Sequence, residues 1–255
     1  MDAINVRLDR MHTYQRIADH KITLMRDNIA SALPHELRTP LNTILGFSDL
    51  LMLDTPNLEP AQVLEWADHI NQAGMRLYRL IENYLMYVRI ETISRDAARA
   101  TTLQQKRTVD AAMIIELQAM TRAEQAHRDA DLVIEMAKCD SLVMSEQDLT
   151  KAIDELLDNA FKFSKPGQTV TVRGEIQNEH YLVHISDYGR GMTNEQIKQV
   201  GAFMQFERWL HEQQGTGLGL IVARGLVELY GGTLHLVSTP QVGTTATMTL
   251  LIDKQ

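Results

Sequence analysis

The chain has 255 residues, of which 44% are hydrophobic, and its formal net charge is −8 at pH 7. This length and apolar content allow one large or two ordinary domains with a buried core. The acidic balance and the lack of a run of Lys and Arg exclude nucleic-acid binding as the main activity, because phosphate neutralisation needs clustered cations.

Cysteine usage and hydropathy bear on the compartment. Cys139 is the only cysteine, so the chain cannot form an internal disulfide or a Cys-based metal site, which favours a reducing environment. The longest apolar stretch, ILGFSDLLML, is too short and too polar to span a bilayer, and no signal-peptide pattern follows Met1. We expect a cytoplasmic location without membrane contact by this stretch, and a longer parent protein that is membrane-attached is compatible with it.

The first part of the chain has a helical period. Apolar and small residues recur at alternating steps of four and three from Ile4 onward and again from Val63 to Val88, which is a heptad seam. Between the two runs, DTPNLEP at 54–60 supplies turn residues and prolines. We predict an antiparallel helical hairpin in a domain over 1–98. One hairpin cannot cover its own apolar seam, so two chains are expected to pair into a four-helix bundle. The alternative is a coiled-coil spacer, which has the same period.

The first predicted helix contains the stretch SALPHELRTPL at 31–41, in which Pro34 and Pro40 lie on either side of His35. A helix proline lacks an N–H and clashes with the carbonyl one turn earlier. Because the apolar seam resumes after Pro40, we interpret the stretch as a kinked helix and not as a helix that ends at Leu33. The kink lets the helix bend next to a histidine.

From about Arg99 the periods change. Helices are predicted over 111–128 and 145–163, the second with Ser145 as N-cap. Alternating strands are predicted over 169–176 and 180–187, and a strand hairpin over 231–252. Helices and hairpin-linked strands in separate runs predict an α+β sandwich with a mainly antiparallel sheet, in a second domain over 99–255.

The helix that contains DELLDNAFKF has a polar stripe, because Glu155, Asn159 and Lys162 follow one another at i, i+4 and i+7. An acid, an amide and an ammonium in line suit a hydrated Mg²⁺ ion and the phosphates bound to it. A solvated helix face with an Asp158–Lys162 ion pair has the same pattern.

The strand in YLVHISDYGRGM ends in Asp187, which shares a face with apolar residues. A carboxylate at that place needs a partner to offset its desolvation, and an adenine amino group is a suitable donor. Gly189 and Gly191 allow a ligand to approach the backbone closely. An ordinary turn has the same glycine pattern.

Three alternating glycines in GTGLGL, from Gly215, precede the next predicted helix. Free N–H groups and the positive end of the helix dipole make an anion site there. The spacing fits neither a P-loop nor a dinucleotide fingerprint. A merely flexible loop is the alternative.

In this order, DELLDNAFKF, DYGRGM, FMQFER and GTGLGL resemble the N, G1, F and G2 boxes of the ATP-binding domain of sensor histidine kinases, within the wider GHKL ATPase family. HELRTPL resembles their phosphoacceptor box. The likeness covers nearly the whole chain, and five boxes in the right order are far more specific than one. It implies ATP and Mg²⁺ as cofactors.

The resemblance also implies site residues. It implies that Asn159 is a magnesium ligand and that Asp187 is the acid that binds adenine. Glu155 replaces an asparagine of many family members, which leaves open whether it ligates magnesium or activates water. The resemblance also implies that residues 203–214 form a mobile lid over bound ATP. The implied nucleotide site comprises Asn159, Lys162, Phe163, Asp187, Gly189, Gly191, Phe206, Arg208, Gly215, Thr216, Gly217, Leu218 and Gly219.

The mechanistic hypothesis is that His35 Nε2 attacks the γ-phosphate of ATP, with Glu36 accepting or orienting the other ring proton. In-line positioning and charge neutralisation govern such a transfer. The resemblance further implies a response-regulator receiver aspartate as the next acceptor, and Thr39 orienting a water in the reverse phosphatase reaction. The implied partners are a second copy, the receiver domain, and a sensor domain or partner outside this chain.

Two other functions fit parts of the chain. A GHKL ATPase that couples hydrolysis to conformational clamping explains the second half but leaves HELRTPL without a purpose. A non-catalytic dimeric scaffold would relay signals or phosphoryl groups through His35. The intact Asn159, Asp187 and glycine series argue against the scaffold.

Overall fold

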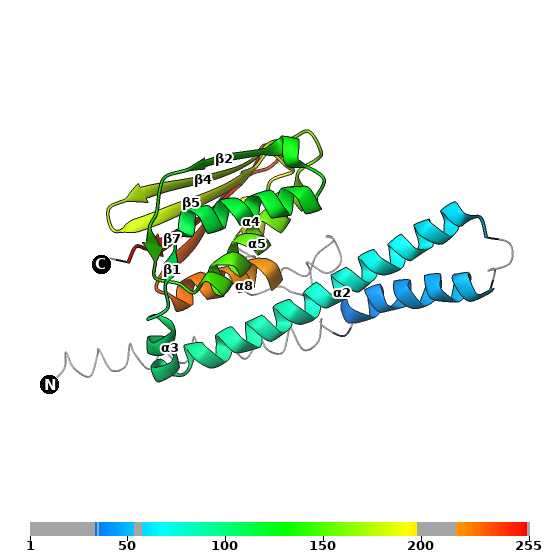
Figure 1. Ribbon diagram of the computed structural model, residues 1–255, viewed down its shortest axis with the longest axis horizontal. Coiled ribbons are helices and arrows are strands. Elements are labelled where there is room, and N and C mark those ends of the chain that lie inside the picture. The colour runs from blue at the N-terminus through cyan, green and yellow to red at the C-terminus, as the bar shows by residue number, and fades with distance from the viewer. Residues whose placement is uncertain (1–33, 35, 54–57, 198–217, 254–255) are drawn as a thin grey trace. The chain divides into compact units, whose positions relative to one another are not determined.

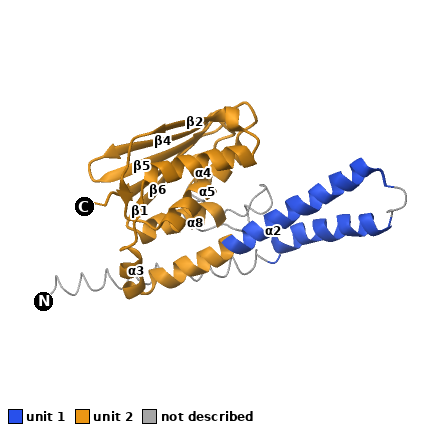
Figure 2. Ribbon diagram, viewed as in Figure 1, with its two compact units in different colours: residues 1–82, 199–216 blue, residues 83–198, 217–255 orange. Residues whose placement is uncertain are grey.

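The computed structural model describes residues 34, 36–53, 58–197 and 218–253. The chain divides into two compact units, Met1–Glu82 with Gln199–Thr216 and Asn83–Lys198 with Gly217–Gln255 (Figure 2). The division falls inside one long helix, α2 (Pro60–Ser94). The last turns of α2 therefore belong to the second unit.

The described part of the first unit is a helical hairpin. Residues 36–53 are helical, and α2 begins at Pro60, a position where a helix needs no backbone N–H. Phe47 of the first helix stacks on His69 of α2 with ring centroids 4.6 Å apart. The predicted antiparallel hairpin is therefore confirmed.

The first helix continues through Pro40, which is buried within the helical run. The helix therefore runs on past Pro40, whereas the choice between a kinked helix and a helix that ends at Leu33 stays a prediction. Leu33 and His35 lie outside the described residues. The bend itself stays a prediction.

The second unit is built on a five-stranded sheet in the order β2-β4-β5-β7-β6 (Figure 1). Only β2 and β4 pair in parallel, and the other pairs are antiparallel. The strands are β2 (Leu132–Met136), β4 (Val170–Gln177), β5 (His180–Asp187), β6 (Thr233–Thr239) and β7 (Gly243–Leu251). A separate short pair joins β1 (Thr108–Val109) and β3 (Ser141–Leu142).

Helices cover one face of this sheet. They are α4 (Ala111–Gln125), α5 (Glu146–Phe163) and α8 (Leu218–Leu229), while α3 (Ala97–Leu103) and the short η2 (Asp129–Asp131) are connecting elements. Tyr181, Val183 and Ile185 of β5 point into the core with at most 2% exposure, whereas His184 on the other face is half-buried. Alternation along the strand therefore separates a core face from an open face.

The predicted fold, a helical hairpin followed by an α+β sandwich with a mainly antiparallel sheet, is confirmed. Ser145 caps α5 as predicted, since its side chain accepts a hydrogen bond from the backbone N–H of Asp148. The helix predicted over 111–128 ends at Gln125. The sequence did not predict β1, β2, β3 or α3. The domain boundary at 98/99 stays a prediction.

In the part of the chain that the structure describes, no helix combines the length and the apolar character needed to cross a bilayer.

Candidate nucleotide site

Helix α5 is the element around which the predicted site residues gather. Glu155, Asn159 and Phe163 follow one another at one-turn intervals, so they share a helix side. Glu155 is buried, Asn159 and Phe163 are half-buried, and Lys162 is exposed. The adjoining apolar side of α5 is in the core, where Leu149, Ile153 and Leu156 are at most 3% exposed. The amphipathic pattern thus fixes which side of α5 is available to a ligand.

Asp187 ends β5 as a half-buried acid beside the glycine turn. The backbone N–H of Gly189 donates to its Oδ1 at 2.8 Å. Burial raises the pKa of Asp187, and hydrogen bonds from the Gly189 and Thr244 backbones only partly oppose that rise. A ligand that donates a further hydrogen bond would stabilise the ionised form.

The turn after Asp187 requires its glycines. A Cβ on Gly189 would overlap the carbonyl oxygen of Phe163, and a Cβ on Gly191 would overlap that of Thr239. Gly191 also has φ +62°, a conformation that other residues rarely adopt. The backbone N–H of Arg190 donates to Phe163 O at 3.2 Å, which ties the turn to the end of α5.

Phe163 lies next to two cations. The Arg190 guanidinium carbon is 4.2 Å from the ring centroid and Lys162 Nζ is 5.2 Å from it, both within cation–π range. Burial lowers the pKa of Arg190. Arg190 was not among the predicted site residues, although it stands inside DYGRGM, three residues after the acid at the end of the strand.

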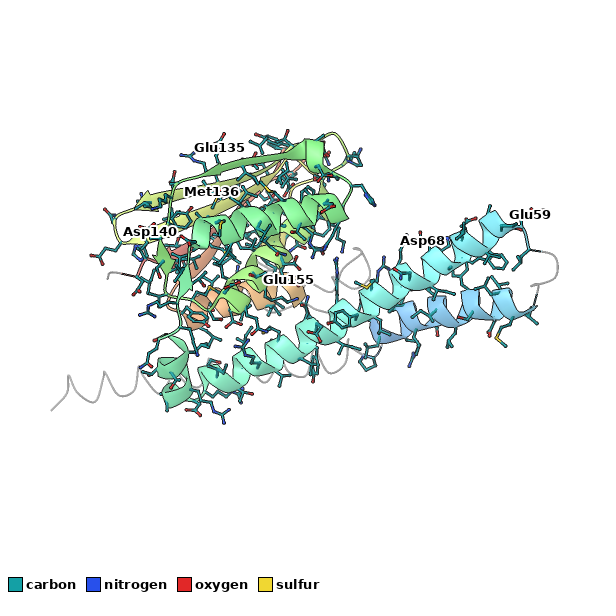
Figure 3. The ribbon with its side chains drawn as sticks, viewed as in Figure 1. Glu59, Asp68, Glu135, Met136, Asp140 and Glu155 are labelled. Atoms are coloured by element: carbon teal, nitrogen blue, oxygen red, sulfur yellow. The ribbon has the colours of Figure 1, made fainter. Side chains whose placement is uncertain are left out.

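The carboxylate of Glu155, labelled in Figure 3, has a partner on each oxygen. Lys151 Nζ donates to Oε1 at 2.6 Å, and Asn83 Nδ2 of α2 donates to Oε2 at 3.0 Å. A Cβ on Gly219 would overlap Oε2, so this glycine leaves room for the acid beside the first described turn of α8. Neither Lys151 nor Asn83 was predicted; Lys151 stands at i−4 from Glu155, whereas nothing in the sequence points to Asn83.

A second buried acid fastens the end of α2 to α5. Asp148 is fully buried and accepts bonds from Arg89 Nη1 at 2.6 Å and Arg89 Nη2 at 3.1 Å. Tyr230 Oη adds a third at 2.7 Å. Burial opposes ionisation of Asp148, but these hydrogen bonds outweigh it and lower its pKa. Burial and the bond to Asp148 raise the pKa of Tyr230 to about 12.

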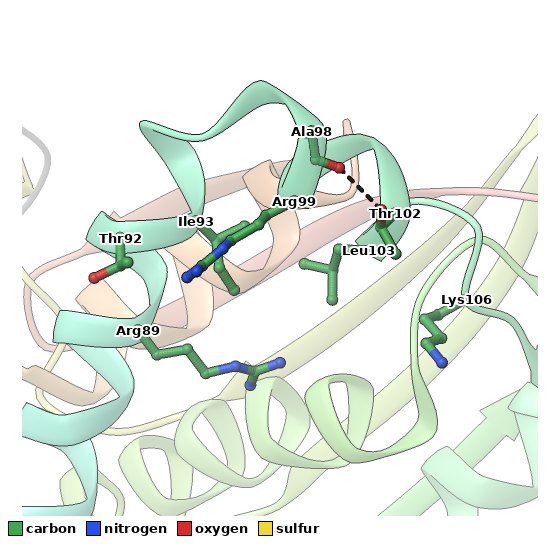
Figure 4. A pocket seen from close by; sticks show the side chains of 8 residues that line it. All are labelled: Arg89, Thr92, Ile93, Ala98, Arg99, Thr102, Leu103 and Lys106. Atoms are coloured by element: carbon green, nitrogen blue, oxygen red, sulfur yellow. Dashed lines mark hydrogen bonds between the residues drawn. The ribbon is translucent and has the colours of Figure 1, made fainter.

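A groove of about 520 Å³ lies beside this contact, between the end of α2 and α3 (Figure 4). Its lining is made of cations, hydroxyls and apolar residues: Arg89, Thr92, Ile93, Ala98, Arg99, Thr102, Leu103 and Lys106. None of the predicted nucleotide residues is among them. The groove is therefore not the predicted ATP site.

The structure brings part of the predicted site together. Contacts with α5 join the turn at Gly189 and Gly191 to Phe163, and Gly219 to Glu155. Leu218 is buried beside Gly219 in α8. The predicted residues Phe206, Arg208, Gly215, Thr216 and Gly217 lie outside the described residues, as does the predicted lid over 203–214.

The predicted phosphoacceptor residues belong to the first unit. Glu36 and Thr39 are on the helix over residues 36–53, Thr39 is exposed, and its carbonyl accepts a bond from Thr43 Oγ1 at 3.2 Å. His35 itself lies outside the described residues.

The residues around α5 fit a magnesium-bound nucleotide. Within the described ranges there is no cluster of three or more His, Cys, Asp and Glu side chains that could hold a metal ion by itself. Mg²⁺ needs few protein oxygens, since water and phosphate supply the others. The amide oxygen of Asn159 and the carboxylate of Glu155 are donors of the right kind.

A mainly antiparallel sheet under three helices, with an acid at a strand end and glycine turns against one central helix, defines an ATP-binding domain of the GHKL type. Family comparison agrees: residues 144–254 match the family described as histidine kinase-, DNA gyrase B-, and HSP90-like ATPase. Residues 25–93 match the His Kinase A (phospho-acceptor) domain. The chain therefore carries the two domains of a histidine kinase catalytic core, the phospho-acceptor domain followed by the ATPase domain.

Individual relatives agree with this family. The chain is 31% identical over 227 residues to an uncharacterized sensor-like histidine kinase of Rhizobium meliloti, covering 88% of this chain and 42% of that protein. It is 28% identical over 250 residues to the non-motile and phage-resistance protein of Caulobacter vibrioides, covering 95% of this chain and 29% of that protein. The chain thus spans less than half the length of these relatives.

A solved structure shows the same fold. The Acinetobacter baumannii histidine kinase AdeS superposes with a TM-score of 0.62 at 18% identity, over 86% of this chain and 98% of that one.

Proposed function

We propose that the chain is an ATP-dependent protein-histidine kinase of a two-component system, which phosphorylates its own His35 and passes the phosphoryl group to an aspartate of a response-regulator receiver domain. The observation that carries this proposal is the presence, in one chain and in this order, of a phospho-acceptor domain match and an ATPase domain match. The HELRTPL stretch falls inside the first match.

In the nucleotide site, Asp187 accepts a hydrogen bond from the adenine amino group, and the turn at Gly189 and Gly191 gives the base access to the backbone. Asn159 supplies an oxygen to magnesium, and Lys162 contacts phosphate. Bound magnesium supplies charge neutralisation on the phosphates. The half-buried state of Asn159 and Asp187 supports these roles, because each side chain is fixed by its element yet open on one side.

At the phosphoacceptor site, His35 Nε2 is the nucleophile and Glu36 accepts or orients the other ring proton. As the N–P bond forms, the bond between the γ-phosphorus and the β–γ bridging oxygen breaks and ADP leaves. Thr39, exposed one turn further on, orients a water for dephosphorylation of the receiver. Residues 1–98 serve as the phosphotransfer domain and 99–255 as the ATP-binding domain.

The functional unit is a homodimer whose hairpins pair into a four-helix bundle. Uncovered apolar side chains of the hairpin support this, among them Leu45, Met52, Leu53 and Leu64, which are 53 to 81% exposed. A sensor domain or partner protein outside this chain supplies the input. Use of ATP and the absence of disulfide-forming cysteines support a cytoplasmic location.

The test is incubation with magnesium and γ-labelled ATP, followed by acid and base treatment of the labelled protein. Acid-labile, base-stable label that His35→Gln abolishes, while that variant still binds nucleotide, establishes phosphohistidine. Nucleotide binding or hydrolysis without any label on the wild-type protein would point to the clamp-type ATPase instead. Label that persists on His35→Gln would show another phosphorylated residue.

A further inference from the structure

Asn83 of α2 contacts the carboxylate of Glu155 on α5. Its Nδ2 donates to Glu155 Oε2 at 3.0 Å, and the two side chains belong to the same compact unit. Asn83 is 6% exposed and Glu155 is 7% exposed, so water does not compete for this bond. A buried hydrogen bond to a carboxylate restrains the acid more than one on the surface does.

The side-chain amide of Asn83 also has a polar atom that lacks a partner in the described part of the chain. Its other polar atom, Asn83 Oδ1, is buried and has no hydrogen-bond partner among the described residues. Exchanging the amide atoms would not help, because Oδ1 would then face the carboxylate and the N–H₂ group would be left alone. A buried unpaired acceptor is destabilising, so stability alone does not explain an asparagine here.

Glu155 is thereby held in one place. Its Oε1 is taken by Lys151 Nζ, and its Oε2 lies between Asn83 Nδ2 and the backbone of Gly219 in α8. A lone pair of a carboxylate oxygen that accepts a hydrogen bond is not available to a metal at the same time. In this arrangement Lys151 and Asn83 compete with magnesium for the oxygens of Glu155.

Of the two residues that donate to Glu155, only Asn83 belongs to α2. Lys151 is on α5 itself, four residues before Glu155, and moves with it. Asn83 is fixed by α2, whose next turns are anchored by the two bonds from Arg89 to Asp148 and by Ile90, which would meet a Cβ on Gly225 of α8. A shift of this end of α2 relative to α5 would act on Glu155 through Asn83.

We propose that Asn83 is a positioning residue that restrains Glu155, and that release of this bond makes the carboxylate available to the magnesium-bound nucleotide. The inference rests on the proposed nucleotide site. Glu155 stands one helical turn before Asn159, so a freed carboxylate would lie on the side of α5 where Asn159 is expected to hold the metal. The end of α2 thus sets how strongly nucleotide binding depends on Mg²⁺.

The test measures binding of a fluorescent ADP analogue to the full chain at increasing Mg²⁺ concentrations. Asn83→Leu removes the donor and the unpaired acceptor while keeping the branching and the number of side-chain heavy atoms. We expect the Mg²⁺ concentration at half-maximal binding to fall about fivefold, the equivalent of one restraining hydrogen bond. In the Glu155→Gln background, the same Asn83→Leu change should have no effect on that concentration. Asn71→Leu, an exposed asparagine of α2, is the matched control and should leave it unchanged.

A second readout needs no nucleotide. If the bond exists, the shifts in the urea midpoint caused by Asn83→Leu and Glu155→Gln should not add in the double variant. An unchanged or increased Mg²⁺ requirement in Asn83→Leu, with wild-type binding intact, overturns the inference and leaves the proposed function standing. Failure of the wild-type chain to bind the analogue at any Mg²⁺ concentration overturns the proposed function and the inference with it.

Discussion

Asp187 is the residue whose role in nucleotide binding can be separated most clearly from a role in folding. Its pKa is raised by burial, which means that its ionised form costs stability in the folded protein once the pH exceeds the ordinary carboxyl range near about 4. Asp187→Asn should therefore keep or increase the thermal midpoint at neutral pH. The same change should lower nucleotide affinity at least about tenfold, because a hydrogen bond to a charged acceptor is lost.

The pH dependence provides a check on the same residue. Wild-type affinity for a fluorescent ADP analogue should fall as the pH drops through the raised pKa of Asp187, since protonation removes the acceptor charge. The residual binding of Asp187→Asn should not follow that fall. Asp129→Asn, in an exposed turn, is the control. Equal affinities of wild type and Asp187→Asn would remove Asp187 from the site.

Single residues differed in how far the sequence could predict them. Gly189, Gly191 and Asp187 stand within a few positions of each other, so their local geometry follows from the chain itself, and the positive φ of Gly191 agrees with a need for glycine. Asn83 meets Glu155 across 72 residues of sequence. Such a pair depends on the packing of α2, α5 and α8, and no spacing rule predicts it.

At the level of elements, the contact between the end of α2 and α5 depends on a buried ion pair. Arg89→Met should destabilise the folded protein by about 3 kcal/mol, because it leaves the fully buried Asp148 without its bidentate partner. The side chain of Arg89 is 37% exposed, which places the expected cost at the lower end of the range for buried pairs. Urea unfolding of the full chain measures this difference.

The matched control for this pair is Arg173→Met. Arg173 pairs with Glu175 on the surface, where the side chains are 57% and 38% exposed, so its loss should change the unfolding free energy by less than about 1 kcal/mol. The pKa of Asp148 is lowered in the folded protein, so its ionised carboxylate stabilises the fold above the ordinary carboxyl range, and this stabilisation is lost as the pH falls through the lowered pKa. The difference in unfolding free energy between wild type and Asp148→Asn should therefore shrink as the pH falls. Equal costs for the two Arg→Met changes would contradict the anchoring role of Arg89.

Elements with a strong local signal were predicted and the others were not. Helix α5 has an apolar stripe and a Ser145 cap, and β4 and β5 alternate cleanly, so period and capping were sufficient. β1 and β3 have two residues each and are defined by their pairing across the sequence, Thr108 with Leu142 and Val109 with Ser141. β2 pairs in parallel with β4 after a long connection, and its five residues, LVIEM, are nearly all apolar and lack the alternation that predicted β4 and β5.

For the whole molecule, the uncovered side of the hairpin leads to a prediction about assembly. Leu45 is on the predicted seam and is 53% exposed in the single chain, an arrangement that a stable monomer rarely maintains over a continuous apolar surface. Leu45→Glu should raise the dimer dissociation constant by at least about tenfold, because each copy loses a buried leucine and places a carboxylate in the seam. Sedimentation equilibrium across a concentration series measures the change.

The control for assembly uses the same substitution in the second unit. Leu117 of α4 is 64% exposed, more than Leu45, but it is outside the heptad seam. If exposure of any leucine drove association, Leu117→Glu would weaken the dimer as much as Leu45→Glu does. If the seam drives it, Leu117→Glu leaves the dissociation constant unchanged and only Leu45→Glu produces monomer. A wild-type chain that stays monomeric at all concentrations would mean that a partner other than a second copy covers the hairpin.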